Sequence, residues 1–202
     1  MITGRIGAGK STLLRTLLGL LPANHGTISW NQRPVTDPAS FFVPPRCAYT
    51  PQVPQLFSDS LQSNIQMGLP TTPEQVEQAL RLAVMEEDVP HLQSGLQTLI
   101  GAKGVKLSGG QRQRAAAARM FVRDPELLVF DDLSSALDVE TENLLWDRTF
   151  ARGDRTYLVV SHRRPALERA DRIILMKDGQ IEGMGSLNKL LEEHEEMQLL
   201  WN

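Results

Sequence analysis

The sequence has little of several features that would assign a protein to a class at once. It carries a single cysteine, Cys47, which excludes an internal disulfide and a cluster of thiolate metal ligands. Its formal net charge of -3 gives no general positive field, which argues against nucleic acid as a partner. No run approaches the ~20 apolar residues that a membrane-spanning helix needs. We therefore expect any membrane association to depend on a partner.

What is present suffices for one α/β domain with a sizeable core, at 202 residues and 41% hydrophobic content. Apolar runs at 127–130, 156–160 and 172–176, separated by helical patterns, are typical of strands buried on both faces of a parallel sheet. Asp178-Gly179 predicts a hairpin turn at the edge of that sheet. Short strands are expected at 27–30 and 47–50, and helices at 10–21, 60–67, 73–85, 110–123 and 186–201, the last with a solvated face carrying Glu192, Glu193, Glu195 and Glu196.

A glycine-rich segment stands between a strand fragment at 1–3 and the helix expected at 10–21. Residues 4–11, G-R-I-G-A-G-K-S, match the phosphate-loop pattern G-x-x-x-x-G-K-[ST]. Backbone amides close around a phosphate only where side chains are absent, and a helix N-terminus adds a favourable field. Lys10 is expected to reach the β and γ phosphates and Ser11 to bind Mg²⁺. We predict a site for magnesium-bound ATP formed by Gly4, Arg5, Ile6, Gly7, Ala8, Gly9, Lys10, Ser11 and Thr12.

Two carboxylates follow the apolar run 127–130. Asp131 and Asp132 would lie at the carboxyl end of a buried strand, where α/β sheets place their ligands. Asp131 is expected to orient Mg²⁺ or its water shell, and Asp132 to polarise the attacking water as a general base. The alternative is a helix cap or turn, because a serine pair follows at 134–135. Because the chain also carries a phosphate loop, metal binding by Asp131 is the favoured interpretation of this pair.

A second anion-binding device occurs later in the chain. The segment 107–111, L-S-G-G-Q, offers a serine hydroxyl and two glycine amides at the start of a helix. Either the chain binds two nucleotides, or each device supplies half of a site shared between two subunits. The segment resembles the signature motif of ATP-binding cassette (ABC) proteins, whose signature residues correspond here to Leu107, Ser108, Gly109, Gly110 and Gln111.

The resemblance covers essentially the whole chain and implies its architecture. It implies a P-loop NTPase fold with a RecA-like parallel sheet and an inserted helical subdomain. The core would span 1–52 and 125–185, the subdomain 53–124 and a closing helix 186–202. The strands and the adenine-stacking aromatic residue that precede the phosphate loop in the family are expected to be missing, as in an N-terminally truncated cassette. Two cassettes would pack head to tail, each signature facing the partner's phosphate loop.

Further motifs follow the family's order. Gln52 matches the Q-loop glutamine, which the resemblance implies touches Mg²⁺ or the lytic water, and His162 resembles the switch histidine that contacts the γ-phosphate. The resemblance thus implies Asp132, His162, Gln52 and Lys10 as catalytic residues, and Ser11, Gln52 and Asp131 as magnesium ligands. The D-loop would be formed by Ser135, Ala136, Leu137 and Asp138.

Within the family, the chain looks most like exporter-type cassettes. Residues 49–58 and the Asn64-Ile65 pair carry that likeness, and 98–104 keeps the exporter glycines but has Leu99 where an acidic residue is common. The implied function is to power a transporter through ATP-dependent dimerisation. The implied partners are a second cassette, identical or not, and transmembrane domains, with the chain peripheral on the cytoplasmic side of the membrane.

One departure from the family concerns hydrolysis. Asp132 stands where hydrolytic members usually carry glutamate, and its carboxylate is shorter by one methylene, roughly 1.5 Å. We therefore predict slow turnover. One alternative is a regulatory half with little hydrolysis. Another is a soluble cassette protein acting on DNA or ribosomes, which predicts long heptads, zinc-type cysteine pairs or a basic surface, and none is evident.

Overall fold

A six-stranded sheet organises the molecule. The computed structural model describes residues 1–101 and 105–201, so the last three residues of the exporter-type segment, 102–104, lie outside the described residues. The strand order is β4-β5-β6-β1-β7-β8, in which the first five strands are parallel and the last is antiparallel. The strands are β1 (Ile2–Thr3), β4 (Cys47–Thr50), β5 (Leu127–Asp131), β6 (Thr156–Val160), β7 (Ile173–Lys177) and β8 (Gln180–Gly185). The predicted α/β fold with a parallel sheet is confirmed.

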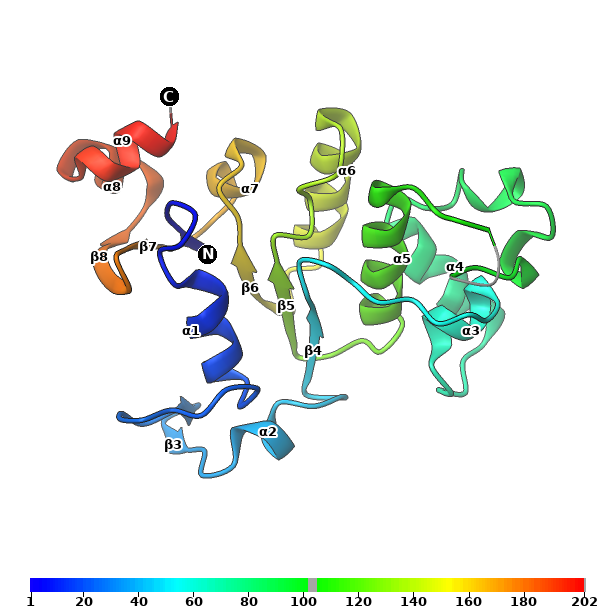
Figure 1. The fold of residues 1–202 in the computed structure, drawn as a ribbon, viewed down its shortest axis with the longest axis horizontal. Helices are drawn as coiled ribbons and strands as arrows, with labels where there is room; N and C mark the ends of the chain where they lie inside the picture. The colour runs from blue at the N-terminus through cyan, green and yellow to red at the C-terminus, as the bar shows by residue number, and fades with distance from the viewer. Residues whose placement is uncertain (102–104, 202) are drawn as a thin grey trace.

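Two groups of helices lie at the two ends of the sheet. Figure 1 shows α3 (Leu61–Gln66), α4 (Pro73–Leu82) and α5 (Gly109–Phe121) at one end, and α8 (Leu187–Glu193) and α9 (Glu195–Trp201) at the other. The remaining elements are α1 (Lys10–Leu17), α2 (Pro38–Phe41), α6 (Val139–Phe150), α7 (Arg164–Glu168), the hairpin β2 (Ser29–Trp30) with β3 (Arg33–Pro34), and the 3-10 turns Val89–His91 and Gly95–Gln97. None of the helices within the described ranges is both long and apolar enough to cross a bilayer.

An aromatic cluster joins the middle of the sheet to α6. Phe130 of β5 meets Trp146 edge-on, with ring centroids 5.5 Å apart, and Trp146 stacks on Phe150 at 5.3 Å. Phe130 and Trp146 are fully buried. Each such side chain contributes roughly 2–3 kcal/mol by burial, and the aromatic geometry adds about 1 kcal/mol. The cluster fixes β5, and with it the two carboxylates at its end.

The first helix is shorter than the sequence predicts. It ends at Leu17 rather than at residue 21, because Gly19 adopts a φ of 72° that continues no helix. A Cβ at Gly19 would lie 2.3 Å from the backbone nitrogen of Ala39. The close approach of the first residues of α2, rather than Pro22, therefore sets the end of α1.

The hairpin prediction is confirmed and the first short strand differs. Asp178 and Gly179 both have positive φ, 49° and 79°, between the paired Lys177 and Gln180, as a two-residue hairpin requires. The strand expected at 27–30 covers only Ser29–Trp30, and it pairs with β3 outside the main sheet.

The closing segment is two helices, so the prediction of one helix over 186–201 is wrong. His194 breaks it with an extended conformation, φ -127° and ψ 114°, and its imidazole packs on Gly183. Glu196 does not lie on a solvated face, since it is only 3% exposed. Its carboxylate forms ion pairs with Arg5 Nε at 2.5 Å and with Lys177 Nζ at 3.6 Å. Charge pairing across the fold accounts for its burial.

Candidate functional site

The phosphate loop needs glycine for its backbone conformation as well as for ligand access. Gly4, Gly7 and Gly9 have φ values of 144°, 87° and 91°, which side chains rarely adopt. A Cβ on Gly4 would lie 2.1 Å from the carbonyl oxygen of Met176 in β7. The loop therefore leaves β1 close against its neighbouring strand and delivers the chain to the N-terminus of α1.

Lys10 folds back over its own loop. Its Nζ donates to the carbonyl oxygens of Gly4 at 2.6 Å and Arg5 at 2.8 Å. Burial lowers the pKa of this ammonium group, and the carboxylates of Asp132 and Asp131 oppose that shift. The lysine thus closes the loop with interactions that phosphate oxygens could replace.

Asp131 is the most buried carboxylate of the site, with 1% exposure. Its Oδ1 accepts a hydrogen bond from Ser11 Oγ at 2.8 Å, and its Oδ2 accepts one from the Tyr49 hydroxyl at 3.3 Å. Arg15 lies 4.0 Å from the same Oδ2. Asp131 is therefore held rigidly with one oxygen against the hydroxyl of the phosphate loop.

Asp132 lies beside two other predicted site residues. Its backbone has a φ of 52°, a left-handed conformation that aspartate tolerates better than most residues. Gln52 Nε2 donates to its Oδ2 at 3.2 Å, and His162 Nδ1 lies 3.9 Å from its Oδ1. Among the described residues, this buried Oδ1 has no hydrogen-bond donor. Gln52 thus contacts the second carboxylate and not Asp131.

One open pocket of about 320 Å³ brings these groups together. The loop, the end of β5, the Q-loop segment and the turn after β6 all contribute to it, through Ile6, Gly7, Gly9, Lys10, Ser11, Thr12, Gln52, Asp131, Asp132, Val160, Ser161 and His162. Of the predicted nucleotide-binding residues, three lie elsewhere: Gly4 against β7, Ala8 in the core and Arg5 at Glu196.

The donor atoms of the pocket suit magnesium. Ser11 and Asp131 present adjacent oxygens, which matches the preference of Mg²⁺ for hard oxygen ligands. Over the described part of the chain, no group of three His, Cys, Asp or Glu side chains could hold a metal alone. Mg²⁺ usually binds through one or two carboxylates together with substrate phosphates.

The signature residues lie outside this pocket. Ser108 caps α5: its Oγ accepts from the Gln111 amide at 3.1 Å, and the Gln111 side chain accepts from the Ser108 amide at 3.0 Å. A Cβ on Gly110 would lie 3.1 Å from the carbonyl oxygen of Ala136. Leu107 is buried. The structure therefore places the signature against the D-loop of the same chain.

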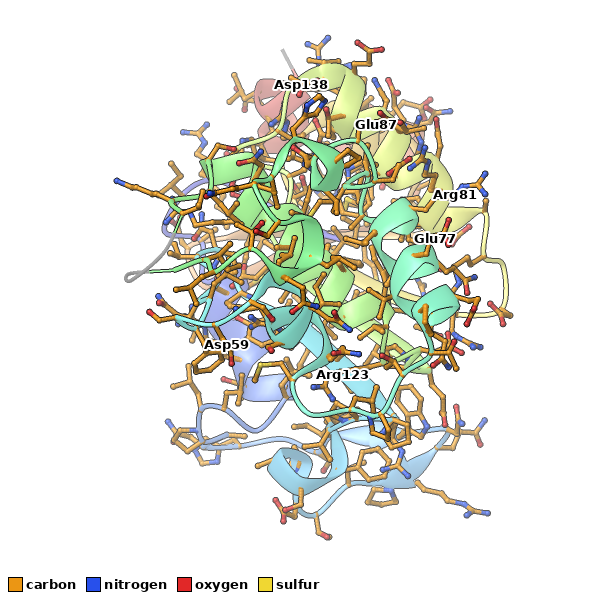
Figure 2. All side chains as sticks on the ribbon, turned by 90° about the vertical axis from the view of Figure 1, so that its right-hand side faces the viewer. Asp59, Glu77, Arg81, Glu87, Arg123 and Asp138 are labelled. Atoms are coloured by element: carbon orange, nitrogen blue, oxygen red, sulfur yellow. The ribbon has the colours of Figure 1, made fainter. Side chains whose placement is uncertain are left out.

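The D-loop leads directly into α6. Asp138 caps that helix, accepting hydrogen bonds from the amide and the hydroxyl of Thr141, and these bonds lower the pKa of its carboxyl. Figure 2 shows Asp138 at the upper edge of the face presented by α3, α4 and α5. Ser135 and Ala136 are exposed and Leu137 is buried. The D-loop is thus anchored at its far end and open to solvent in its middle.

Four residues that sequence reasoning missed complete this region. Tyr49 binds Asp131, Gln113 and Arg163 bind the D-loop, and Glu142 pairs with Arg163. The available signals were weak: Arg163 directly follows the predicted switch histidine, and Gln113 follows the signature by two positions. Neither position indicates a partner, because the contacts are long-range.

Comparisons with known proteins identify the family of the chain. A family model described as "ABC transporter" matches residues 1–135. The chain is 37% identical to "ABC transporter ATM1" of Toxoplasma gondii over 95% of its own length and 17% of that protein. It is 36% identical to the "Probable multidrug resistance ABC transporter ATP-binding/permease protein YheI" of Bacillus subtilis, over 98% of the chain and 35% of that protein.

A solved structure titled "Structure of a bacterial Atm1-family ABC exporter with ATP bound" superposes with a TM-score of 0.89 and 30% identity, covering 99% of this chain and 35% of that one. The chain thus spans about a third or less of the proteins it matches. The chain belongs to the ABC transporter family and resembles the ATP-binding domains of its exporters.

Proposed function

We propose that this chain binds magnesium-ATP and hydrolyses it to drive an exporter. The observation that carries the proposal is one pocket in which a phosphate loop, the adjacent oxygens of Ser11 and Asp131, and a second carboxylate, Asp132, converge. Phosphoryl transfer requires little covalent chemistry from the protein, so positioning and charge stabilisation suffice. The pocket supplies both.

Each side chain then has a role that its geometry supports. Lys10 would exchange the carbonyls of Gly4 and Arg5 for β and γ phosphate oxygens. Ser11 and Asp131 would hold Mg²⁺, which supplies Lewis-acid polarisation of the phosphoryl oxygens when bound. His162, more than half exposed at the rim of the pocket, would contact the γ-phosphate.

Asp132 is the candidate for the general base. Gln52 occupies its Oδ2, which leaves Oδ1 as the oxygen able to accept a proton from the attacking water. We further propose that turnover is slow, because aspartate is shorter than glutamate by one methylene, about 1.5 Å, and general-base catalysis depends on hydrogen-bond reach.

The test of this role is Asp132→Glu in the intact protein. Lengthening the side chain should raise kcat on the order of tenfold without a comparable change in KM. Asp132→Asn should abolish steady-state ATPase activity while leaving ATP binding. The exposed Asp147, which is 59% accessible on α6, provides the matched control Asp147→Glu. An unchanged kcat in Asp132→Glu would show that the short carboxylate does not limit the rate.

The proposed partners follow from the position of the signature. Ser108, Gly109 and Gly110 lie outside the pocket, so a second cassette would have to supply its own signature to close it. We propose a cassette dimer, with identical or different halves, attached to transmembrane domains on the cytoplasmic side of a membrane. ATP-dependent association, measured by light scattering with and without Mg²⁺, tests the dimer directly.

A second candidate function is a regulatory cassette that binds ATP but hardly hydrolyses it. The hydrogen bond from Gln52 favours it, because it holds the candidate base to one side. Single-turnover measurements separate the two functions. Release of phosphate from prebound ATP within the time of a transport cycle supports hydrolysis, whereas stoichiometric ATP retained over many cycles supports regulation.

A further inference from the structure

Arg163 holds the D-loop from the side of the switch histidine. It directly follows His162, and its guanidinium NH1 donates to the carbonyl oxygens of Ser134 at 2.8 Å and Leu137 at 3.1 Å. A guanidinium presents several donors in a fixed planar arrangement, so it can hold two carbonyls at a defined separation. Ser134 directly precedes the D-loop and Leu137 lies within it, and the two residues close a turn in which the Leu137 amide donates to the Ser134 carbonyl at 3.0 Å.

A buried carboxylate fixes the guanidinium in turn. Arg163 Nε forms an ion pair with Glu142 Oε2 at 2.7 Å, and Glu142 is fully buried. The other oxygen of Glu142 accepts hydrogen bonds from Ser134 Oγ at 2.5 Å and Trp146 Nε1 at 3.3 Å. Because Trp146 belongs to the aromatic cluster of the core, the carboxylate has little freedom to move.

The backbone on the histidine side is also constrained. The amide of Arg163 donates to Ser161 Oγ at 3.1 Å, and the amide of Ser161 donates to the carbonyl of Ile2 at 3.2 Å. His162 is thus the exposed residue between a buried strand end and a side chain that grips the D-loop. A displacement of His162 toward a ligand therefore acts on a residue whose guanidinium is tied to residues 134 and 137.

We propose that Arg163 is a positioning residue that, through Glu142, couples His162 to the geometry of the D-loop. The proposal rests on the proposed function, since it assigns to His162 a contact with bound ATP. Its consequence is that the pocket of one chain sets the conformation of the surface that this chain's D-loop offers to a second cassette. This coupling needs no contact between Arg163 and the nucleotide.

A purely structural role for the pair predicts something different. Removing one partner of a buried pair strands the other charge and destabilises the fold, whereas removing both with side chains of similar volume is often close to neutral. The double variant Glu142→Gln with Arg163→Met removes both charges. The amide oxygen introduced by Glu142→Gln can still accept from Ser134 and Trp146, so only the hold on the D-loop carbonyls is lost.

The control removes another arginine–carboxylate pair, more exposed to solvent, that does not touch the D-loop. Arg169 pairs with Asp147 of α6 at 2.7 Å, five residues beyond Glu142. The variant Asp147→Asn with Arg169→Met deletes a carboxylate from the same helix, α6, and a guanidinium from the opposite end of α7 to Arg163. Hydrogen–deuterium exchange of the intact protein without nucleotide, followed by steady-state ATPase kinetics, compares the two double variants.

We expect faster exchange at residues 134–138 in the Glu142/Arg163 variant, with α1 and α5 unchanged, and a kcat lowered on the order of tenfold at nearly constant KM. Arg163→Lys keeps the positive charge but loses the planar guanidinium. Its D-loop amide exchange and its kcat should therefore lie between those of the wild type and the double variant. This single variant also serves if the double variant is unstable. Unchanged D-loop exchange, or a kcat within twofold of the control in both variants, would overturn the proposal.

The nucleotide-free exchange measurement keeps this inference separate from the proposed function. A wild-type protein that neither binds nor hydrolyses ATP defeats the proposed function, and with it the role given to His162. Normal ATP turnover with an unaltered D-loop in the variants defeats the coupling alone.

Discussion

The phosphate loop and the D-loop are held in different ways. Residues 4–11 form a loop whose lysine bonds to carbonyls five and six residues away, and whose glycines supply the backbone conformation. The D-loop is held by side chains from elsewhere: Gln113 and Arg163 lie 23 and 29 residues from the groups they bind. The first is held mainly by its own residues, with Ser11–Asp131 and Arg5–Glu196 as side-chain contacts to distant segments, whereas the second depends on two other parts of the fold.

Because the two loops are held differently, we expect them to respond differently to substitutions. The conformation of a loop that is held mainly by its own residues should change more when one of those residues is replaced than when a distant residue is replaced. A loop held by distant side chains is sensitive to the position of α5 and of the segment after β6, which suits it to report their state. Substitutions in each loop and at its contacts test this contrast.

The largest expected effect belongs to the phosphate loop. Lys10→Met should weaken ATP binding about a hundredfold, about 2.8 kcal/mol, because a partly buried charge that would pair with phosphate is lost. Isothermal titration with magnesium-ATP measures the change. Lys189→Met, at an exposed position of α8, is the control. Affinity within threefold of wild type in the Lys10 variant would contradict the assignment of this lysine to the phosphates.

At the D-loop we expect a smaller effect, which lowers kcat but not ATP affinity. Gln113 is 5% exposed, donates to Ser135 Oγ at 2.8 Å and accepts from the Ala136 amide at 3.0 Å. Gln113→Leu removes both hydrogen bonds, worth about 1 kcal/mol each. ATPase kcat should fall about fivefold while ATP affinity stays unchanged, since this side chain does not line the pocket.

The exposed Gln93 supplies the matched variant Gln93→Leu for that measurement. A loss of ATP affinity in Gln113→Leu equal to the loss in kcat would blur the contrast between the two loops, because it would mean that the D-loop contacts also shape the phosphate site.

The smallest effect tests a largely exposed distant contact of the phosphate loop. Arg5 Nε pairs with the buried Glu196 of α9 at 2.5 Å, but the arginine side chain is 60% exposed. Solvent screening limits such a pair to about 1 kcal/mol, so Glu196→Gln should weaken ATP binding only about threefold. Titration calorimetry at low and high salt measures it, with Glu193→Gln, exposed on α8, as the control. A loss of ATP affinity comparable to that of Lys10→Met would show that the phosphate loop is not held mainly by its own residues.

Much of the fold could be read from the order of apolar runs and glycines. The three strands predicted at 127–130, 156–160 and 172–176 appear at or within one residue of those limits, and the Asp178-Gly179 turn is where expected. The errors have a common cause. The early end of α1 at Gly19 and the break at His194 both arise where a distant segment, α2 or Gly183, packs against the chain. A local pattern contains no information on that packing.

By itself, the sequence determined the phosphate loop, the order of the motifs and the presence of two carboxylates at a strand end. These follow from short-range rules: backbone conformations that only glycine adopts readily, and apolar periodicity that defines where a strand stops. Only the tertiary structure decided that Gln52 faces Asp132 rather than Asp131, that Glu196 is buried, and that Gln113 and Arg163 hold the D-loop. Hydrogen bonds and ion pairs between distant segments exist only once packing has brought their groups within reach.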